Sequence, residues 1–234
     1  GDHRDLHSFP TRRSSDLKDS RGQGVAVMKI IIAGYGKFGH LALTRLAELD
    51  FIPEIHVVDL HISDSGAPSH LDVNFHEIDI LEYLINLTNV WDHCVIIPTV
   101  PFHLAAQYFL KIYSGFEKTV LGNDLNETLP NVFRLDFSTI CCSHADFLCP
   151  DNCPEATTCA VTGETRKPLF EKLSDTIYKG QRIRVIRSRQ ILPGIGGFKF
   201  RTIKRTASEI CRDSSLVLAT SCRCHGILTA IRRK

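Results

Sequence analysis

Residues 28–59 read MKIIIAGYGKFGHLALTRLAELDFIPEIHVVD, and this stretch decides the fold. It opens with a short isoleucine-rich run at 28–33, which is typical of a buried parallel strand. A glycine turn follows, and leucines then recur at close to helical spacing over 40–49. Pro53 closes the connection, and Ile55–Leu60 predicts a second strand. This order of strand, helix and strand predicts a right-handed βαβ crossover and a parallel sheet.

The glycine turn has the G-x-G-x-x-G spacing of a Rossmann dinucleotide-binding unit, with Gly34, Gly36 and Gly39 at the start of the predicted helix. The three glycines permit a tight turn, close approach of a pyrophosphate to the backbone, and close packing of helix on strand. The helix N-terminus adds free N–H groups and partial positive charge. Asp59 ends the second strand, where a carboxylate accepts hydrogen bonds from ribose hydroxyls. The predicted cofactor is NAD, with NADP and FAD as alternatives.

The residues predicted to bind the cofactor are those of the turn, the carboxylate and a threonine after a later strand: Gly34, Tyr35, Gly36, Lys37, Phe38, Gly39, Asp59 and Thr99. His103 follows that threonine and is a candidate general acid or base, although a histidine there is also typical of a capping or surface position. No catalytic residue is assigned. The competing interpretation is a glycine turn that binds nothing.

The alternation of strands and helices continues to residue 130. The other predicted strands are Val73–Ile78, Cys94–Pro98 and Thr119–Leu121, and the predicted helices are His40–Leu49, Asp79–Leu87 and Phe102–Tyr113. Asp79 is the expected N-cap of its helix. Residues 28–130 are therefore predicted to form a dinucleotide-binding Rossmann domain.

Residues 131–234 are predicted to form a cysteine-rich α/β extension, either continuing the first sheet or standing as a small appended domain. Its predicted strands are Val132–Ile140, Arg182–Ser188 and Leu216–Thr220, and its predicted helices are Pro168–Tyr178 and Thr202–Cys211. Leu192–Gly197 is interpreted as a glycine-rich turn. The expected fold class is thus α/β, a Rossmann-like parallel sheet followed by this extension.

Nine cysteines are many for 234 residues. Clustered cysteines in a reducing compartment are more often metal ligands or redox groups than disulfides. The predicted metal ligands are Cys149, Cys153, Cys159, Cys222 and Cys224. Their density predicts a zinc ion or an iron–sulfur cluster, although their spacing matches neither the paired CxxC knuckles of a zinc ribbon nor the ferredoxin pattern. A redox-active thiol pair and plainly buried cysteines are the alternatives.

The net charge is only +2, but residues 179–205 hold nine Lys or Arg and no Asp or Glu. Such a field attracts phosphate, an acidic partner or nucleic acid. Ile183, Val185 and Ile186 alternate with the charges as in a half-buried strand, which favours a solvated face, and nucleic acid is not expected as a partner. The turn at 193–197 is a second candidate anion site, flanked by Arg187, Arg189 and Lys199, although a plain tight connection is favoured.

Residues 1–27 are set apart as a non-native leader. The first 17 residues resemble the in-frame translation of a short-read sequencing adapter, and Met28 is the expected start. No segment reaches the length of apolar sequence that a bilayer span requires, and no signal sequence is recognisable. The expected location is therefore cytoplasmic. The expected ligand is a dinucleotide, and a homodimer or a redox partner protein stays open.

Residues 29–59, with their glycine turn and Asp59, resemble two groups of proteins: the N-terminal nucleotide-binding domain of the potassium-uptake regulators, and that of saccharopine-dehydrogenase-like oxidoreductases. The resemblance covers residues 28–123. The first group implies ligand-dependent gating without chemistry, and the second implies hydride transfer. The functional hypothesis is an NAD(P)-binding, oxidoreductase-like protein with a metal or iron–sulfur site. The alternative is a non-catalytic nucleotide-binding redox or metal sensor, or a regulatory subunit.

Overall fold

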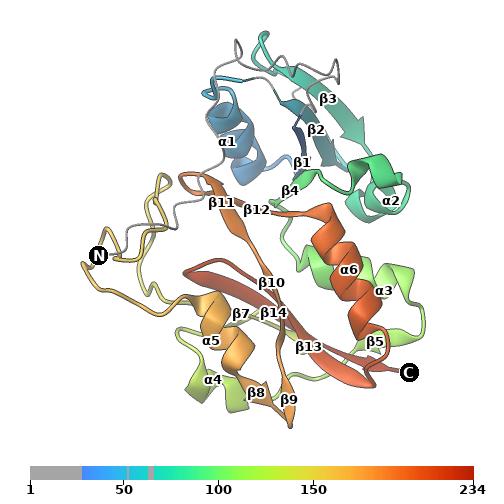
Figure 1. The fold of residues 1–234 in the computed structure, drawn as a ribbon, viewed down its shortest axis with the longest axis vertical. Helices are drawn as coiled ribbons and strands as arrows, with labels where there is room; N and C mark the ends of the chain where they lie inside the picture. Colours follow the sequence, from blue (N-terminus) through green and yellow to red (C-terminus); the bar gives the residue numbers. More distant parts are fainter. Residues whose placement is uncertain (1–27, 52, 63–65) are drawn as a thin grey trace, which may run out of the picture.

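The computed structural model describes residues 28–51, 53–62 and 66–234. Over these residues the chain is a mixed α/β protein with two six-stranded sheets and one two-stranded hairpin (Figure 1). The predicted leader, residues 1–27, lies outside the described residues and stays a prediction. No helix in the described part of the chain combines the length and apolarity that a membrane crossing requires.

The first sheet has the strand order β11-β12-β4-β1-β2-β3. Its four parallel strands come from the first half of the chain: β1 (Lys29–Ala33), β2 (Glu54–Asp59), β3 (Asp72–Glu77) and β4 (Val95–Pro98). Two strands from the second half extend it antiparallel beyond β4: β11 (Arg189–Leu192) and β12 (Ile195–Lys199). The parallel strands thus lie where the sequence predicts them.

Helices lie on both faces of this sheet. Ile30 and Ile32 of β1 pack in one cluster with Leu43 and Leu46 of α1 (Lys37–Leu46), whereas Ile31 faces the other side. The other helical segments of the first half are α2 (Ile80–Ile85), the 3-10 turn η2 (Asn89–Trp91), α3 (Leu104–Ile112) and α4 (Asp124–Thr128). The predicted N-cap of α2 is confirmed, because the Asp79 carboxylate accepts hydrogen bonds from two N–H groups of the first turn.

The second sheet has the order β10-β13-β14-β7-β6, and β5 also pairs with β14. Its strands are β5 (Phe116–Lys118), β6 (Phe133–Arg134), β7 (Thr139–Ser143), β10 (Arg184–Arg187), β13 (Ser215–Ser221) and β14 (His225–Arg233). The remaining elements are α5 (Leu169–Asp175), the hairpin β8 (Ile177–Tyr178) and β9 (Gln181–Arg182), and α6 (Phe200–Ile210). Only β10 and β13 pair in parallel here.

Several elements differ from the sequence predictions. The strand predicted at Val132–Ile140 is divided into β6 and β7, and the helix predicted at Pro168–Tyr178 ends at Asp175 and is followed by β8. The segment interpreted as a turn at 192–197 turns only around Gly194 and continues as β12, because Gly197 packs tightly against β4: a Cβ there would lie 2.6 Å from the Ile96 carbonyl oxygen. Residues 119–121 do not form the expected strand; the strand here is β5, which ends at Lys118 and pairs antiparallel with β14 of the second sheet. β14 is not among the predicted strands, because residues 222–226 are interpreted from their cysteines and histidine and not from hydrophobic alternation.

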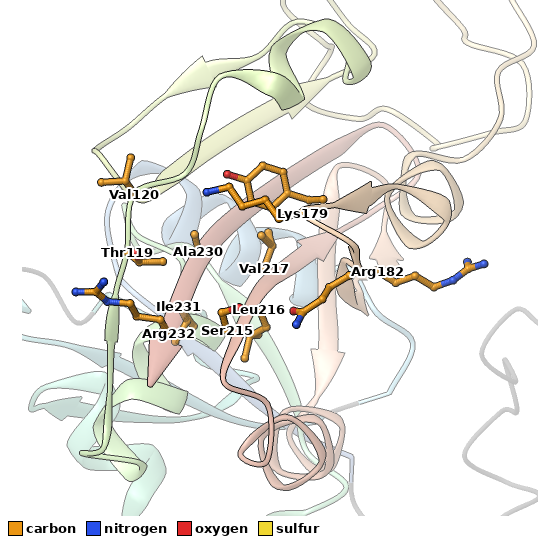
Figure 2. A pocket seen from close by; sticks show the side chains of 12 residues that line it. Thr119, Val120, Lys179, Arg182, Ser215, Leu216, Val217, Ala230, Ile231 and Arg232 are labelled. Atoms are coloured by element: carbon orange, nitrogen blue, oxygen red, sulfur yellow. The ribbon is translucent and has the colours of Figure 1, made fainter. Parts of the chain in front are cut away.

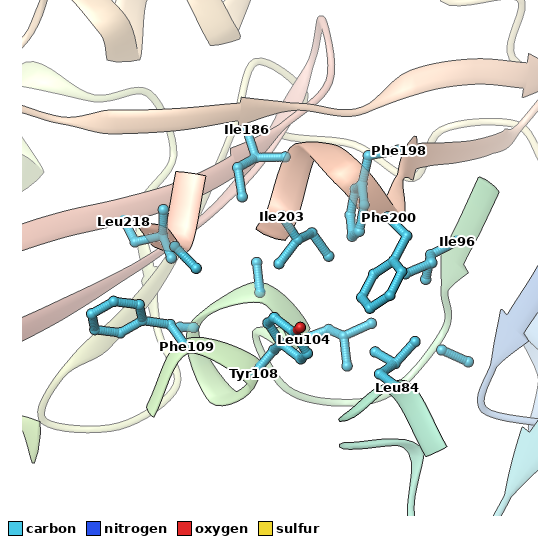
Figure 3. Close-up of a cluster of buried hydrophobic side chains, with 14 of the residues drawn as sticks. Leu84, Ile96, Leu104, Tyr108, Phe109, Ile186, Phe198, Phe200, Ile203 and Leu218 are labelled. Atoms are coloured by element: carbon cyan, nitrogen blue, oxygen red, sulfur yellow. The ribbon is translucent and has the colours of Figure 1, made fainter. Parts of the chain in front are cut away.

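The largest core cluster joins the two sheets (Figure 3). Phe109 of α3 and Phe200 and Ile203 of α6 are fully buried between Ile96 of the first sheet and Leu218 of the second. Strands also cross the predicted boundary at residue 130, since β5 joins the second sheet while β11 and β12 join the first. The division into two separate domains stays a prediction.

Candidate functional site

The glycine turn is fastened between three strands. Gly34 has φ +104°, a conformation that favours glycine, and its N–H donates to the Val58 carbonyl at 2.8 Å. The Thr99 hydroxyl lies 2.9 Å from the Ala33 carbonyl oxygen and 2.7 Å from that of Gly34. Thr99 therefore holds the turn against the end of β4. Both hydrogen bonds of its hydroxyl are made to the backbone of Ala33 and Gly34.

The other two glycines of the turn have opposite surroundings. A Cβ on Gly39 would lie 2.2 Å from the Gly34 carbonyl oxygen, so α1 can approach the turn this closely only without a side chain there. A Cβ on Gly36, the N-cap of α1, would meet nothing within 4 Å. The turn thus offers bare backbone and open space beside a helix N-terminus, which is the environment that a phosphate group requires.

Asp59 lies beside this turn, at the end of β2. One carboxylate oxygen accepts a hydrogen bond from the Tyr35 N–H at 2.6 Å, and the other accepts one from the His61 N–H at 3.1 Å. A carboxylate oxygen has two lone pairs, so each keeps acceptor capacity for a hydroxyl group. The Tyr35 ring is buried and stacks on His40, with ring centroids 3.8 Å apart.

Lys37 and Phe38, the remaining residues of the glycine turn, lie in the first turn of helix α1. The Phe38 side chain is exposed, and the Lys37 ammonium lies 5.8 Å from the centre of its ring. The structure therefore gathers the residues predicted to bind the cofactor at one end of the parallel strands. Their contact with a cofactor stays a prediction.

His103 lies away from the surface at the N-cap position of α3, where its side chain makes no capping hydrogen bond. It is buried, with its Nδ1 2.9 Å from the Thr229 hydroxyl and its Nε2 3.0 Å from the Thr220 hydroxyl. Burial, assisted by the charge of Lys118, lowers the pKa of His103 to about 3. A neutral imidazole between two hydroxyls joins α3 to β13 and β14, which argues against a role as acid or base. Sequence reasoning missed this because both partners lie more than 100 residues away.

Four of the five predicted metal ligands line one small cavity. Cys149, Cys153, Cys159 and Cys224 surround about 20 Å³ of space, together with Arg166. Three of them come from the loop between β7 and α5, and Cys224 comes from the β13–β14 turn. The antiparallel pairing of β14 with β7 brings these two segments together.

The thiols of this cavity influence each other electrostatically. Burial raises the pKa of Cys149, and the neighbouring Cys153 and Cys159 raise it further. Burial raises the pKa of Cys224 to about 11, and the smaller contributions come from Glu155 and the other three cysteines. Negative charge on the neighbouring cysteines therefore disfavours the thiolates of Cys149 and Cys224, and a cation in the cavity would reverse that effect. Cys159 differs, because hydrogen bonds from Thr162 and Val161 lower its pKa.

Cys222, the fifth predicted ligand, does not line the cavity. Its sulfur accepts hydrogen bonds from the N–H groups of Cys224 and His225, and burial raises its pKa to about 12. The His225 ring lies between it and the cavity, with Nδ1 3.8 Å from the Cys222 sulfur and Nε2 3.7 Å from that of Cys149. Among the described residues, no three His, Cys, Asp or Glu side chains are arranged as a preformed metal site.

The cysteine loop docks onto the first sheet. The Cys153 carbonyl accepts hydrogen bonds from the Gly194 N–H at 2.9 Å and from the Gln190 side-chain amide at 2.7 Å. Gly194 has φ +77°, and a Cβ on it would lie 1.7 Å from the Asp151 carbonyl oxygen. The β11–β12 hairpin thus contacts the cysteine loop at Gly194, where no side chain fits. This hairpin belongs to the same sheet as the glycine turn.

A separate hollow of about 160 Å³ lies on the second sheet (Figure 2). Leu216, Val217 and Ala230 of β13 and β14 line it, with Lys179 of the β8–β9 turn nearby. None of the residues predicted to bind a cofactor or metal lines this hollow.

The second half of the chain matches a family model. The AF_1314_C family model, described as "Uncharacterized protein, C-terminal domain", matches residues 104–234. An "Uncharacterized protein" of Archaeoglobus fulgidus is 28% identical over 144 residues, which are 59% of this chain and 65% of that protein. The match thus spans slightly less than two thirds of the relative's length. No solved structure matches the chain. The family match includes the four cavity cysteines and leaves the glycine turn outside.

Proposed function

This chain belongs to the AF_1314_C family, whose description states no activity, and from the geometry of its own residues we propose an NAD(P)-binding protein of oxidoreductase type with a cysteine-ligated metal or iron–sulfur site. The proposal interprets β1 to β4 with their helices as a Rossmann-like unit. The observation that carries it is the bare backbone at Gly36, open beside the N-terminus of α1 while Gly39 packs against Gly34.

Two parts of a dinucleotide, the diphosphate and the adenosine ribose, suit this arrangement. A diphosphate beside Gly36 would accept hydrogen bonds from the first N–H groups of α1 and interact with the positive end of the helix dipole. The adenosine ribose would then reach the carboxylate of Asp59, which keeps acceptor capacity on both oxygens. A carboxylate there repels a 2′-phosphate, so we expect NAD to bind more tightly than NADP.

Titration calorimetry with NAD, NADH, NADP and FAD tests this proposal. Gly36→Val should weaken NAD binding about 100-fold, or roughly 2.7 kcal/mol, because its methyl groups fill the space of the diphosphate. Gly115→Val is a matched control, since Gly115 also has nothing within 4 Å of an added Cβ but lies before β5. Absence of NAD binding by folded protein, or equal affinity in the Gly36 variant, would contradict the proposal.

The metal part of the proposal rests on the four cavity cysteines, with Cys222 as the alternative fifth ligand. Soft thiolates select zinc and iron–sulfur clusters, and Arg166 beside them would offset part of the negative charge. Metal binding would require the sulfurs to approach one another, and three of the four sit on a loop, where the backbone and side chains can adjust. When bound, zinc would tie the loop to β14, whereas a cluster would accept electrons.

Elemental analysis and absorption spectra of anaerobically purified protein distinguish the two metals. We expect either one zinc or two to four irons per chain. Cys224→Ser should lose at least nine tenths of the metal, because it removes the ligand that joins the two segments. Cys211→Ser is the control, since Cys211 lies at the end of α6 outside the cavity. Metal retained in the Cys224 variant, or absent from metal-supplied wild type, would refute this site.

A second candidate function is a non-catalytic sensor, and two observations favour it. His103 is fully engaged inside the core, and the cysteine loop is hydrogen-bonded to the β11–β12 hairpin of the sheet that carries the glycine turn. Oxidation of the thiols or metal binding to them would then alter the position of the hairpin and so of that sheet. NADH oxidation with an artificial electron acceptor supports the enzyme, whereas NAD binding without turnover supports the sensor.

A further inference from the structure

A cleft of about 700 Å³ opens between the β11–β12 hairpin, the end of β10 and the start of α6. Five cationic side chains line it: Arg187, Arg189, Lys199, Arg201 and Arg205. Val95, Ile191 and Phe198 provide apolar surface, and among the described residues no Asp or Glu lines the cleft. Its volume is that of a typical small-molecule site.

The positive charge of this cleft has little internal compensation. Of its five cations, only Arg205 has a carboxylate partner among the described residues, namely Glu209 on the helix surface at 3.6 Å. Arg187 stacks on the Phe170 ring with 4.0 Å between guanidinium and ring centre. Burial lowers the pKa of Arg187, and so do the charges of Arg189 and Arg223, whereas the charges of Glu155 and Glu171 raise it less. Like charges brought together in this way repel unless an anion lies between them.

Three other cations of residues 179–205 differ from most of those of the cleft, because they have carboxylate partners. Outside the cleft, Arg182 pairs with Asp175 at 3.8 Å, Arg184 with Asp213 at 3.5 Å, and Lys204 with Asp92 at 2.7 Å. Of the four cations of residues 179–205 outside the cleft, only Lys179 has no carboxylate partner among the described residues, so most of the uncompensated charge of this segment lies in one concave site. A nucleic acid backbone requires the extended arrangement, whereas a compact anion requires the confined one.

The cleft is separate from the glycine turn. Lys199 pairs with Val95 at the first residue of β4, whereas Thr99, which holds the glycine turn, follows the last. Four residues of strand span about 13 Å. The floor is closed by Gly197, where a Cβ would lie 2.6 Å from the Ile96 carbonyl oxygen. A ligand in the cleft would therefore be distinct from a dinucleotide at the turn.

We propose that this cleft binds a compact small molecule carrying several phosphate groups. Arginine presents planar, bidentate donors that match phosphate oxygens, and three of the four Arg side chains have no carboxylate partner among the described residues. The apolar floor accommodates the organic body of such a molecule.

Titration of the full chain with inorganic tripolyphosphate and with ATP, at 0.15 M salt, tests this inference. Both should bind wild type, and the double variant Arg189→Gln, Lys199→Gln should weaken both at least tenfold. The double variant Arg182→Gln, Arg184→Gln removes the same charge outside the cleft and should stay within twofold of wild type. Circular dichroism and Tm confirm that each variant is folded. The Gly36→Val variant should bind tripolyphosphate as tightly as wild type. The proposal of the cleft and the proposal of the dinucleotide site are therefore tested independently.

Two results would overturn the inference. One is the absence of tripolyphosphate binding by wild type at 1 mM, or equal binding by the cleft and control variants. The other is tighter binding of oligonucleotides, with affinity that rises with strand length and falls in both double variants, since that result assigns the positive charge to nucleic acid.

Discussion

Replacing Gly39 with alanine is expected to lower the free energy of unfolding by roughly 3 kcal/mol, whereas alanine at Gly36 should change it by less than about 1 kcal/mol. The new Cβ at position 39 would lie 2.2 Å from the Gly34 carbonyl oxygen. That carbonyl is held by the Thr99 hydroxyl at 2.7 Å, and Gly34 occupies a conformation unfavourable for other residues. Since the turn resists movement, α1 must shift away from β1.

Urea denaturation of the two variants beside wild type measures this difference. Both substitutions add one methyl group to the same turn, so the change in hydrophobicity is matched. Helix propensity favours alanine at Gly39, inside α1, and disfavours it at the N-cap Gly36, so it opposes the expected difference. Equal stability of the two variants would show that α1 does not pack against Gly34 as the structure has it.

In the acid range, the largest pH effect of a single group should come from His103. Its pKa of about 3 in the folded protein lies below the unfolded value near 6.5, so the unfolded chain binds the extra proton first. Stability is therefore complete above pH 6.5 and falls as the pH decreases toward 3, by up to about 1.4 kcal/mol per pH unit from this one group. Protonation would force a charge between two threonine hydroxyls, beside Lys118.

His103→Gln isolates this effect. The variant should be less stable than wild type at pH 7 by about 2 kcal/mol, because at least one of the Thr220 and Thr229 hydroxyls loses its partner. The difference should shrink as the pH falls from 6.5 to 4, since only wild type carries the titrating imidazole. Parallel stability curves over that range would disprove the assignment, because the other histidines titrate in both proteins.

Local signals predicted the first half of the chain well. The isoleucine run gives β1, Asp79 caps α2 as expected, and the parallel strands follow from the alternation of apolar runs with amphipathic segments. These features depend on neighbours within a few residues. The interpretation of Gly196 and Gly197 as a turn failed because a glycine can also serve close contact between strands, and only the partner strand reveals which.

The amino-acid sequence by itself determined the parallel βαβ rhythm, the glycine turn and the dense cysteine loop, because backbone preference and hydrophobic period act over short distances. Only the tertiary structure decided that Cys224 lines the cavity while Cys222 does not, and that His103 lies between Thr220 and Thr229. It also decided which cations of residues 179–205 find carboxylates and which surround a cleft. Those outcomes depend on strand pairing between distant segments, which brings together residues that no local pattern connects.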